Sequence, residues 1–550
     1  MRANIYFKVF KREFGFFATL SFAASISGAF ATITTTFSYP LYAGGAASAV
    51  WCWFISGIGC MCIAASVAEL VSAYPTCGGL YFSVSRLIHP RWVPSISWIT
   101  GWLNLLGQVA GVASSEYGGA QILLAAVSLG SGGSYTPTNA HTVGVQAAMT
   151  IFHGVLNSLS TKWLSKITTT YIVFHGLTIL TCCIALLAMC PDRHDAKYVF
   201  THVDAESASG WTPIGWSFLF GFLSVSWTMT DYDATAHIAE EIDQPETKAP
   251  WAIFIAMALT YVIGWLFTIV LAFTMGDPTD VLASPLEQPV VQIFQNNLGA
   301  KGAIVFAVCA FLIINAVCMV AIQSLARTVF AFSRDRLLPG SKYWKIVDKR
   351  TDTPIIAVWL SVILCAAINL IALGSYITIA AIFNVCAIAL DWSYCIPIIC
   401  KLVGGRFEPG PWHMGKFGKF VNIWACLWTA FVSIIFLFPT VYPVTPDTVS
   451  LPSYAPLCLG LTLTYFSDEL RHRLPCCYLP VRWRLLGHQW PQVLRRTHLR
   501  DSDHRWHAAG EGEGPQLRQR GLPIDTSQFP LFQQTICLKP RDGLQGGSGL

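Results

Sequence analysis

Charge is the scarcest property of this 550-residue sequence. Asp, Glu, Lys and Arg make up only 12% of it, about half of the roughly 25% found in soluble domains. Apolar residues make up 54%, including 20 Trp and 34 Phe, and the mean hydropathy is +0.52. One water-soluble core cannot hide so much apolar surface. The composition therefore excludes a soluble enzyme and a disordered chain, and indicates a polytopic membrane protein.

Several other features are missing. The 18 Cys form no spaced disulfide framework, because most lie inside apolar runs, where Cys packs as a small hydrophobic residue. The apolar runs carry no P-loop and no His, Asp or Cys cluster at catalytic or metal-binding spacing. We therefore expect no enzyme activity, no ATP-driven pumping, no metal and no cofactor. The net charge of +5 is too small to indicate a nucleic-acid partner.

The runs without charge are long enough to cross a membrane. Residues 14–85 contain one charged side chain, Glu69, and residues 92–161 contain one, Glu116. A helical span needs about 20 apolar residues, and the lack of strict alternation favours helices over a barrel. Eleven spans are predicted, at 16–42, 47–73, 93–128, 142–160, 163–190, 214–238, 250–275, 302–333, 355–374, 376–400 and 420–441. A twelfth is expected near 453–470, where the apolar stretch is shortened.

Basic residues in the loops indicate the orientation. With a cytoplasmic N-terminus, nineteen Lys and Arg fall on the cytoplasmic side, and three (Arg193, Lys197 and Lys301) fall outside. Because basic loops stay inside, the N-terminus is predicted to be cytoplasmic. We expect the plasma membrane as the location, with the vacuolar membrane as the alternative.

The chain divides into four predicted segments. They are a short cytoplasmic N-terminus (1–15), a transmembrane transport core (16–441), a degraded twelfth-span region (442–470) and an atypical tail (471–550). Between 451 and 550, Arg outnumbers Lys eleven to one. Such a shift is typical of frame-shifted or translated non-coding sequence, so a gene-model error after Ala455 or a truncated twelfth helix is the leading hypothesis. A genuine cytoplasmic tail is the alternative.

Two spans are interrupted near their middle by small and polar residues. The first reads SFAASISGAFATITTTF, and the sixth reads WSFLFGFLSVSWTMTDYDATAH. Breaks five helices apart are what an inverted five-helix repeat predicts, and transporters of that kind bind substrate where the unwound backbone exposes N–H and C=O groups. The alternative is ordinary close packing, since Gly, Ser and Thr also line helix contacts in membranes.

Motifs flanking these spans resemble a known superfamily. AELVSAYPTCGGLYFSVSRL, WITGWLNLLGQ, DATAHIAEEIDQPETKAPWAI and ARTVFAFSRDRLLPG are similar, in order and position, to elements of the amino acid–polyamine–organocation superfamily. GGAASAVWCW and TDYDATAHIAEE look most like its fungal amino acid/choline transporter branch, which includes GABA and choline permeases. The resemblance runs from about Phe7 to Ala455. It implies a LeuT-like 5+5 inverted repeat of twelve helices, of which eleven are clear, and transport usually driven by protons.

The resemblance assigns substrate-binding roles at the first break. Ser27, Gly28 and Ala29 align with a glycine-rich turn whose exposed N–H groups hold a carboxylate. Ile26 replaces the first glycine of that turn, which hints at a substrate other than a standard α-amino acid. Close packing is the competing interpretation for Ser27 and Gly28.

At the sixth span, the resemblance makes Trp227 an aromatic gate followed by Thr228. A Trp face also binds an ammonium group. Asp231 and Asp233 are costly at this depth and are expected to neutralise a substrate amine. A packing Trp and a helix-capping or buried hydrogen-bonding Asp are the alternatives.

His175 is the predicted proton-coupling residue. It falls where bacterial proton-coupled relatives place a lysine, near a coupling-ion site between spans one, five and eight. An imidazole titrates near neutrality and could load and release a proton. The alternative is a buried histidine bonded to a backbone carbonyl. His153 and His237 are weaker candidates.

Polar residues on the neighbouring spans complete the predicted site. Gln108 and Asn315 are expected to line it, with Glu116 ranked beside them. At the cytoplasmic end, the acidic pair of the sixth span is expected to meet a basic loop as an inner gate, and a solvated charged face is the alternative. The predicted gate residues are Glu240, Glu241, Arg334 and Arg336.

Together these features predict a proton-coupled permease for an amino acid or a related small amine such as GABA or choline, with alternating access around the two breaks. The expected partners are that substrate, protons and the lipid bilayer. A non-transporting nutrient sensor on the same scaffold, or a carrier of an amine-containing secondary metabolite, are the alternatives. A channel would not need the two breaks.

Overall fold

Segments that satisfy their own backbone groups in lipid must be helices or closed barrels, and this chain forms helices. The computed structural model describes residues 12–204, 208–374, 376–438, 440 and 442, without the side chains of 376–383. Regular structure in those ranges is entirely helical, with isolated bridges but no strand. The predicted all-α class is therefore confirmed there. The predicted twelfth-span region and tail, from 443 onward, and residues 1–11 lie outside the described residues.

Among the described residues, eight helical segments are long and apolar enough to cross a membrane. They are α1 with α2 (Phe16–Ser27 and Ala29–Thr36), α3 (Ser38–Ala73), α7 (Thr161–Met189), α12 (Pro245–Thr274), α14 (Pro289–Arg334), α16 with η2 (Ile355–Asn369 and Leu370–Leu373), α17 (Tyr376–Gly404) from Asn384, and η3 with α18 (Gly415–Phe417 and Gly418–Ile435). Each coincides with a predicted span.

The other three predicted spans are helical but more polar or shorter than these eight. They correspond to α5 (Val93–Gly130), α6 (Asn139–Asn157) and the pair α9 and α10 (Ile214–Phe220 and Phe222–Thr228). The first two bury polar side chains along their length, which lowers their hydropathy. The third is interrupted and resumes as α11 (Ala234–His237) and η1 (Ala239–Glu241). Length and composition thus support eight of the eleven predicted spans.

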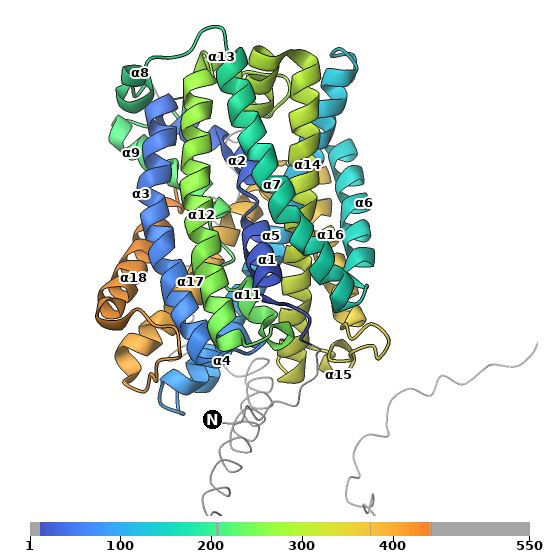
Figure 1. Cartoon of the computed structure of the whole chain (residues 1–550), viewed down its shortest axis with the longest axis vertical. Coiled ribbons are helices and arrows are strands. Elements are labelled where there is room, and N and C mark those ends of the chain that lie inside the picture. The colour runs from blue at the N-terminus through green and yellow to red at the C-terminus, as the bar shows by residue number, and fades with distance from the viewer. Residues whose placement is uncertain (1–11, 205–207, 375, 439, 441, 443–550) are drawn as a thin grey trace, which may run out of the picture. The chain divides into compact units, whose positions relative to one another are not determined.

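Short helices gather at the two ends of the bundle. In Figure 1, α4 (Gly79–Leu87) and α15 (Ser341–Trp344) lie at the lower end, whereas α8 (Ala196–Thr201) and α13 (Pro278–Leu282) lie at the upper end. The first two belong to loops predicted to be cytoplasmic, and the last two to loops predicted to be outside. This separation agrees with the predicted alternation of the loops. Which end faces the cytoplasm stays a prediction.

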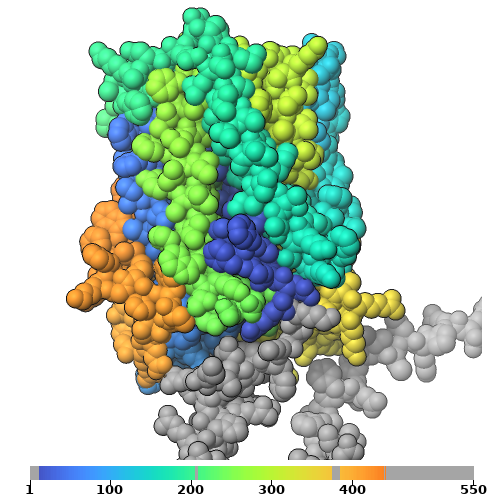
Figure 2. Space-filling model, viewed as in Figure 1, coloured from blue at the N-terminus to red at the C-terminus, as the bar shows by residue number. Residues whose placement is uncertain are grey.

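The helices differ in how deeply they are buried. In the most apolar stretch of α1 and α2, 78% of residues are buried, compared with 39% in α12 and 22% in α7. Figure 2 shows α7 and α12 covering one face, with the dark-blue start of α1 visible between them. The exposed side chains of α7 are mostly apolar, including Val173, Leu177, Leu180 and Ile184. The interrupted first span therefore lies in the interior, and α7 presents an apolar face suited to lipid.

Candidate functional site

The first break is a single residue. Gly28 lies between α1 and α2 with φ +45° and ψ +44°. This left-handed conformation costs other residues roughly 1–2 kcal/mol. A Cβ atom at position 28 would also lie 2.2 Å from Cγ2 of Val317 on α14. Both the backbone conformation and the close approach of α14 therefore require glycine. Gly28 thus serves the predicted break and the close packing that was its alternative.

The break frees backbone N–H groups at the start of α2. Those of Ala31 and Thr32 donate back to the carbonyl oxygen of Gly28 at 2.9 and 3.1 Å. The N–H of Phe30 instead donates to Nε2 of His175 on α7, at 3.1 Å. An imidazole nitrogen that accepts a hydrogen bond carries no proton, so this contact requires an unprotonated Nε2. The observed backbone partner of His175 is an amide N–H, not the carbonyl of the alternative interpretation.

A small pocket lies where α1, α7 and α14 meet. Its lining residues are Ser25, Gly28, Tyr171, Phe174, His175, Ile313 and Ala316. His175 and Gly28, predicted from separate motifs, thus line one pocket at the junction of the first, fifth and eighth predicted spans.

The other residues predicted at the first break are buried. The hydroxyl of Ser27 points to the sulfur of Met257 on α12 at 3.7 Å, and its carbonyl accepts the hydroxyl of Thr32 at 2.9 Å. Ala29 is buried at the first position of α2. A helix break leaves backbone carbonyl groups without an intrahelical partner. The hydroxyl of Thr32 supplies such a partner for the carbonyl of Ser27.

The sixth predicted span approaches the first through its polar residues. The hydroxyl groups of Thr36 on α2 and Ser224 on α10 lie 2.8 Å apart. Thr228 donates to the carbonyl of Ser224 at 2.9 Å, one turn earlier on α10. Trp227 between them is half-buried. The two interrupted spans are therefore joined directly by a hydrogen bond.

The second break covers several residues between α10 and α11. Asp231 has φ +59°, and the buried side-chain oxygens of Thr230, Asp231 (Oδ1) and Tyr232 have no hydrogen-bond partner among the described residues. Buried polar atoms are seldom left without a partner. This stretch therefore offers unused hydrogen-bonding capacity within the bundle.

Asp233, in contrast, is fully engaged by the protein. Its buried carboxyl group accepts from Asn104 Nδ2 at 2.6 Å and from the Tyr394 hydroxyl at 3.0 Å, and it lies 3.0 Å from His237 Nε2. His237 Nδ1 lies 3.1 Å from the carbonyl oxygen of Cys77, which can only accept. Nδ1 of His237 therefore carries hydrogen, and its Nε2 contact with Asp233 needs one further proton, held by the pair as imidazolium with carboxylate or as imidazole with carboxylic acid. This geometry matches the buried hydrogen-bonding alternative for Asp233.

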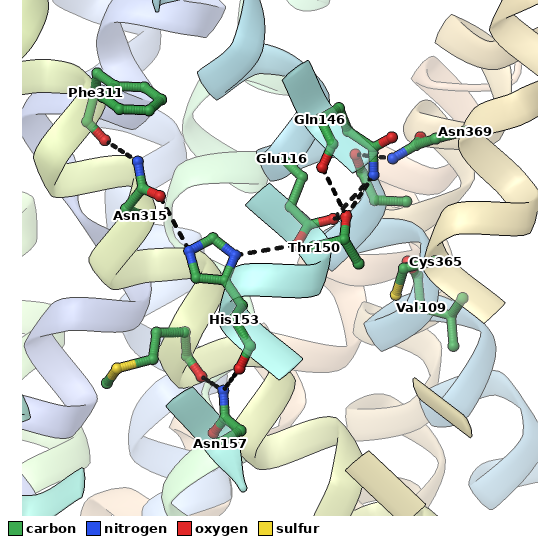
Figure 3. Close-up of polar contacts among 12 residues, drawn as sticks. Val109, Glu116, Gln146, Thr150, His153, Asn157, Phe311, Asn315, Cys365 and Asn369 are labelled. Carbon is green, nitrogen blue, oxygen red and sulfur yellow. Dashed lines mark hydrogen bonds and ion pairs between the residues drawn. The ribbon is translucent and has the colours of Figure 1, made fainter. Parts of the chain in front are cut away.

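Gln108 extends this network to α14. Its Nε2 donates to Asn104 Oδ1 at 3.1 Å, and its Oε1 accepts the hydroxyl of Thr328 at 3.0 Å. Gln108 thus connects the second break to α14. Asn315 lies elsewhere, in a cluster with His153 and Glu116 of α6 and α5 (Figure 3).

At the predicted inner gate, ion pairs form, but only in part as expected. Arg334 pairs with Glu240 at 2.9 Å. Glu241 pairs instead with Arg327 of α14 at 2.8 Å, and both side chains are fully buried. Arg336 is exposed, and among the described residues it pairs with neither glutamate. The expectation for Arg336 is therefore not met, because Arg327 already occupies Glu241.

The pairing of Arg327 with Glu241 was not predicted from the sequence. The one available signal was a cation inside the apolar run VAIQSLARTVFAF, which is unusual in a membrane span. Nη1 and Nη2 of Arg327 and Oε2 of Glu241 have no partner among the described residues. Burial raises the pKa of the Glu241 carboxyl, and the Arg327 guanidinium opposes that rise.

The segment just before α1 is hydrogen-bonded to the backbone beside this pair. Phe14 N–H donates to the carbonyl of Glu241 at 3.1 Å, and Asp243 N–H donates to the carbonyl of Phe14 at 3.0 Å. Phe14 is itself fully buried.

Among the described residues, no group of three or more His, Cys, Asp or Glu side chains is arranged to hold a metal ion.

Most of this chain is similar to known proteins. The family described as "Amino acid permease" matches residues 14–462. The chain is 59% identical over 464 residues to an uncharacterized amino-acid permease of Schizosaccharomyces pombe, covering 84% of this chain and 85% of that relative. It is 49% identical to amino-acid permease 2 of Neurospora crassa (81% and 82% covered) and 32% identical to amino-acid permease BAT1 of Arabidopsis thaliana (84% and 92% covered).

Proposed function

Because the chain belongs to the amino acid permease family, we propose that it is a proton-coupled secondary transporter of an amino acid or a related small amine, of the GABA or choline kind. The family and the eight candidate spans make it a multi-pass membrane protein and a transporter rather than an enzyme. We further propose the plasma membrane as its location. The Lys and Arg bias of its loops supports an N-terminus in the cytoplasm.

The contact between Phe30 N–H and His175 Nε2 carries this proposal. A proton on Nε2 removes the acceptor and sets a cation beside the positive end of α2. The contact therefore opens when His175 is protonated. The released N–H of Phe30, beside Ser27, Gly28 and Ala29, then becomes available to a substrate carboxylate. Proton binding and substrate binding are linked at one break.

The second break supplies the other end of the substrate site. Asp233 is occupied by its own partners, whereas Asp231 has a buried oxygen without one. Asp231 therefore receives the substrate amine, and Trp227 covers it, because a Trp face attracts ammonium groups. The pairs Glu240–Arg334 and Glu241–Arg327 hold the cytoplasmic end closed. Rocking about the two breaks opens each end in turn.

Uptake of isotope-labelled compounds in a host lacking its own permeases tests this function. The panel contains standard amino acids, GABA and choline, each with and without an inward proton gradient. We expect saturable uptake that the gradient increases. Asp231→Asn should weaken uptake of the amine, whereas Asp243→Asn, on an exposed carboxylate paired with Lys248, should not. Binding without uptake would instead identify a nutrient sensor, and uptake indifferent to the gradient would refute proton coupling.

A further inference from the structure

A second histidine–carboxylate pair is formed by α5 and α6, neither of which contains a break. His153 Nδ1 of α6 lies 3.2 Å from Oε1 of Glu116 on α5, and both side chains are fully buried. His153 Nε2 lies 3.1 Å from Oδ1 of Asn315 on α14. Figure 3 shows the imidazole between the two, with Asn315 on one side and Glu116 on the other. The pair therefore joins three helices.

Asn315 fixes which imidazole nitrogen carries hydrogen. Its Nδ2 donates to the carbonyl of Phe311 at 2.6 Å. A flipped amide would set two oxygens against each other there, so Oδ1 must face His153. That oxygen can only accept, and His153 Nε2 therefore carries a hydrogen atom.

The other side of the ring then needs one proton more. If His153 is neutral, its Nδ1 has a lone pair facing Oε1 of Glu116, and an ionised carboxylate offers no hydrogen. The remaining oxygen, Oε2, accepts from Gln146 Nε2 at 3.1 Å and from the Thr150 hydroxyl. The contact between His153 and Glu116 is attractive only when the pair shares one proton, as imidazolium with carboxylate or as imidazole with carboxylic acid.

Among the described residues, the pair has no further charged partner. The other titratable groups found there to face Glu116 are the thiols of Cys318 on α14 and Cys365 on α16. From α2, Thr35 approaches the same part of α5 at Gly118. With the shared proton the pair is neutral overall, and without it a full negative charge stays buried, which is strongly unfavourable.

We propose that Glu116 and His153 form a buried binding site for a single proton. Asn315 of α14 orients the imidazole by accepting a hydrogen bond from His153 Nε2. The site shares no residue with the pocket of His175 or with the Asp233–His237 pair. When its proton leaves, the lone pair of Nδ1 opposes Oε1 and the attraction between α5 and α6 at this point is lost.

The test is reversible denaturant unfolding of the purified full chain in detergent between pH 5 and pH 9. Because the folded contact needs the shared proton, the folded pair binds more protons than the same two groups in the unfolded chain as the pH rises. Its contribution to stability is then present at low pH and lost as pH rises, by up to about tenfold in the unfolding constant per pH unit. Glu116→Gln should remove that dependence, because the amide donates to a neutral Nδ1 without a shared proton.

His141→Gln is the matched control, since His141 is an exposed histidine of the same helix, 2.9 Å from the Tyr135 hydroxyl. It should keep the wild-type pH dependence. Curves for Glu116→Gln and the wild type that stay parallel across the pH range would overturn the proposal.

A second variant covers the case in which Glu116→Gln does not fold. In His153→Gln the carboxyl of Glu116 has lost its counter-charge and must take the proton itself. We expect this variant to be folded at pH 5 and to lose stability steeply by pH 8. Equal destabilisation at both pH values would mean that the pair is merely structural. Neither experiment uses a substrate, so a failure of the proposed transport function leaves the result unaffected.

Discussion

The two helix breaks use the same residue type in opposite states. At the first break, His175 accepts a hydrogen bond and must be unprotonated at Nε2. At the second, Nδ1 of His237 donates to a backbone carbonyl, and its Nε2 shares a proton with Asp233. The helix N-terminus beside His175 disfavours a cation, whereas the carboxylate beside His237 favours one. The first break therefore holds its histidine without a proton on Nε2, whereas the histidine after the second break shares a proton with a carboxylate.

The largest expected effect removes the ionic anchor just after the second break. Glu241→Ala leaves the buried guanidinium of Arg327 without its counter-charge, which should cost about 3–5 kcal/mol in the free energy of unfolding. Denaturant unfolding of the purified protein measures this. Asp243→Ala, two residues on at an exposed pair, is the control and should change little. Equal effects of the two variants would show that the buried pair is not an anchor.

Removing the proton-holding histidine of the second break should cost somewhat less. His237→Gln leaves Asp233 with the neutral donors Asn104 and Tyr394, so we expect a loss of about 2–3 kcal/mol at neutral pH. The loss should shrink as pH falls, because Asp233 can then take a proton itself. Unfolding measured at pH 5 and pH 7.5 checks both points. A loss that does not depend on pH would contradict the shared proton.

The first break depends on glycine rather than on charge. Gly28→Ala should cost about 1–2 kcal/mol for the left-handed backbone, and more for the clash with Val317. Adding Val317→Ala should recover the steric part and leave the backbone part. Unfolding of the two single variants and the double variant separates these contributions. If the double variant regained the full stability of Val317→Ala, a side chain at position 28 would not strain the left-handed backbone.

The smallest expected effect concerns the hydroxyl that caps α1 across this break. Thr32→Val removes the bond to the Ser27 carbonyl and should cost about 0.5–1.5 kcal/mol. The same measurement applies, with Thr170→Val as the control, because Thr170 bonds within the continuous helix α7 and its hydrogen bond is exposed. A larger loss of stability in Thr170→Val than in Thr32→Val would show that the hydrogen bond across the break has no special importance.

Much of the architecture was predictable because it follows from local composition. The mid-span Gly28 and the small and polar residues before Asp231 predicted breaks where α1 and α10 end. The Glu240–Arg334 pair was predictable from opposite charges in facing loops. The resemblance added the pocket of His175, which no local pattern gives.

Pairings between distant segments were not predictable. Nothing local shows that Glu241 selects Arg327, 86 residues away, over Arg336. The i, i+4 spacing of Asp233 and His237 was a usable signal for their pairing, yet their partners Asn104, Tyr394 and Cys77 come from three other helices or loops. Such sets are fixed by packing, which sequence periodicity does not specify.

The pH profile of substrate uptake by His175→Gln tests the proton-coupling role of His175 most directly. A glutamine oxygen can still accept the N–H of Phe30, so the variant should fold and bind substrate, but it has no group to protonate. We predict that uptake by this variant loses the stimulation by acid that the wild type shows. Proton-dependent uptake with an unshifted pH profile would contradict the proton-coupling role of His175.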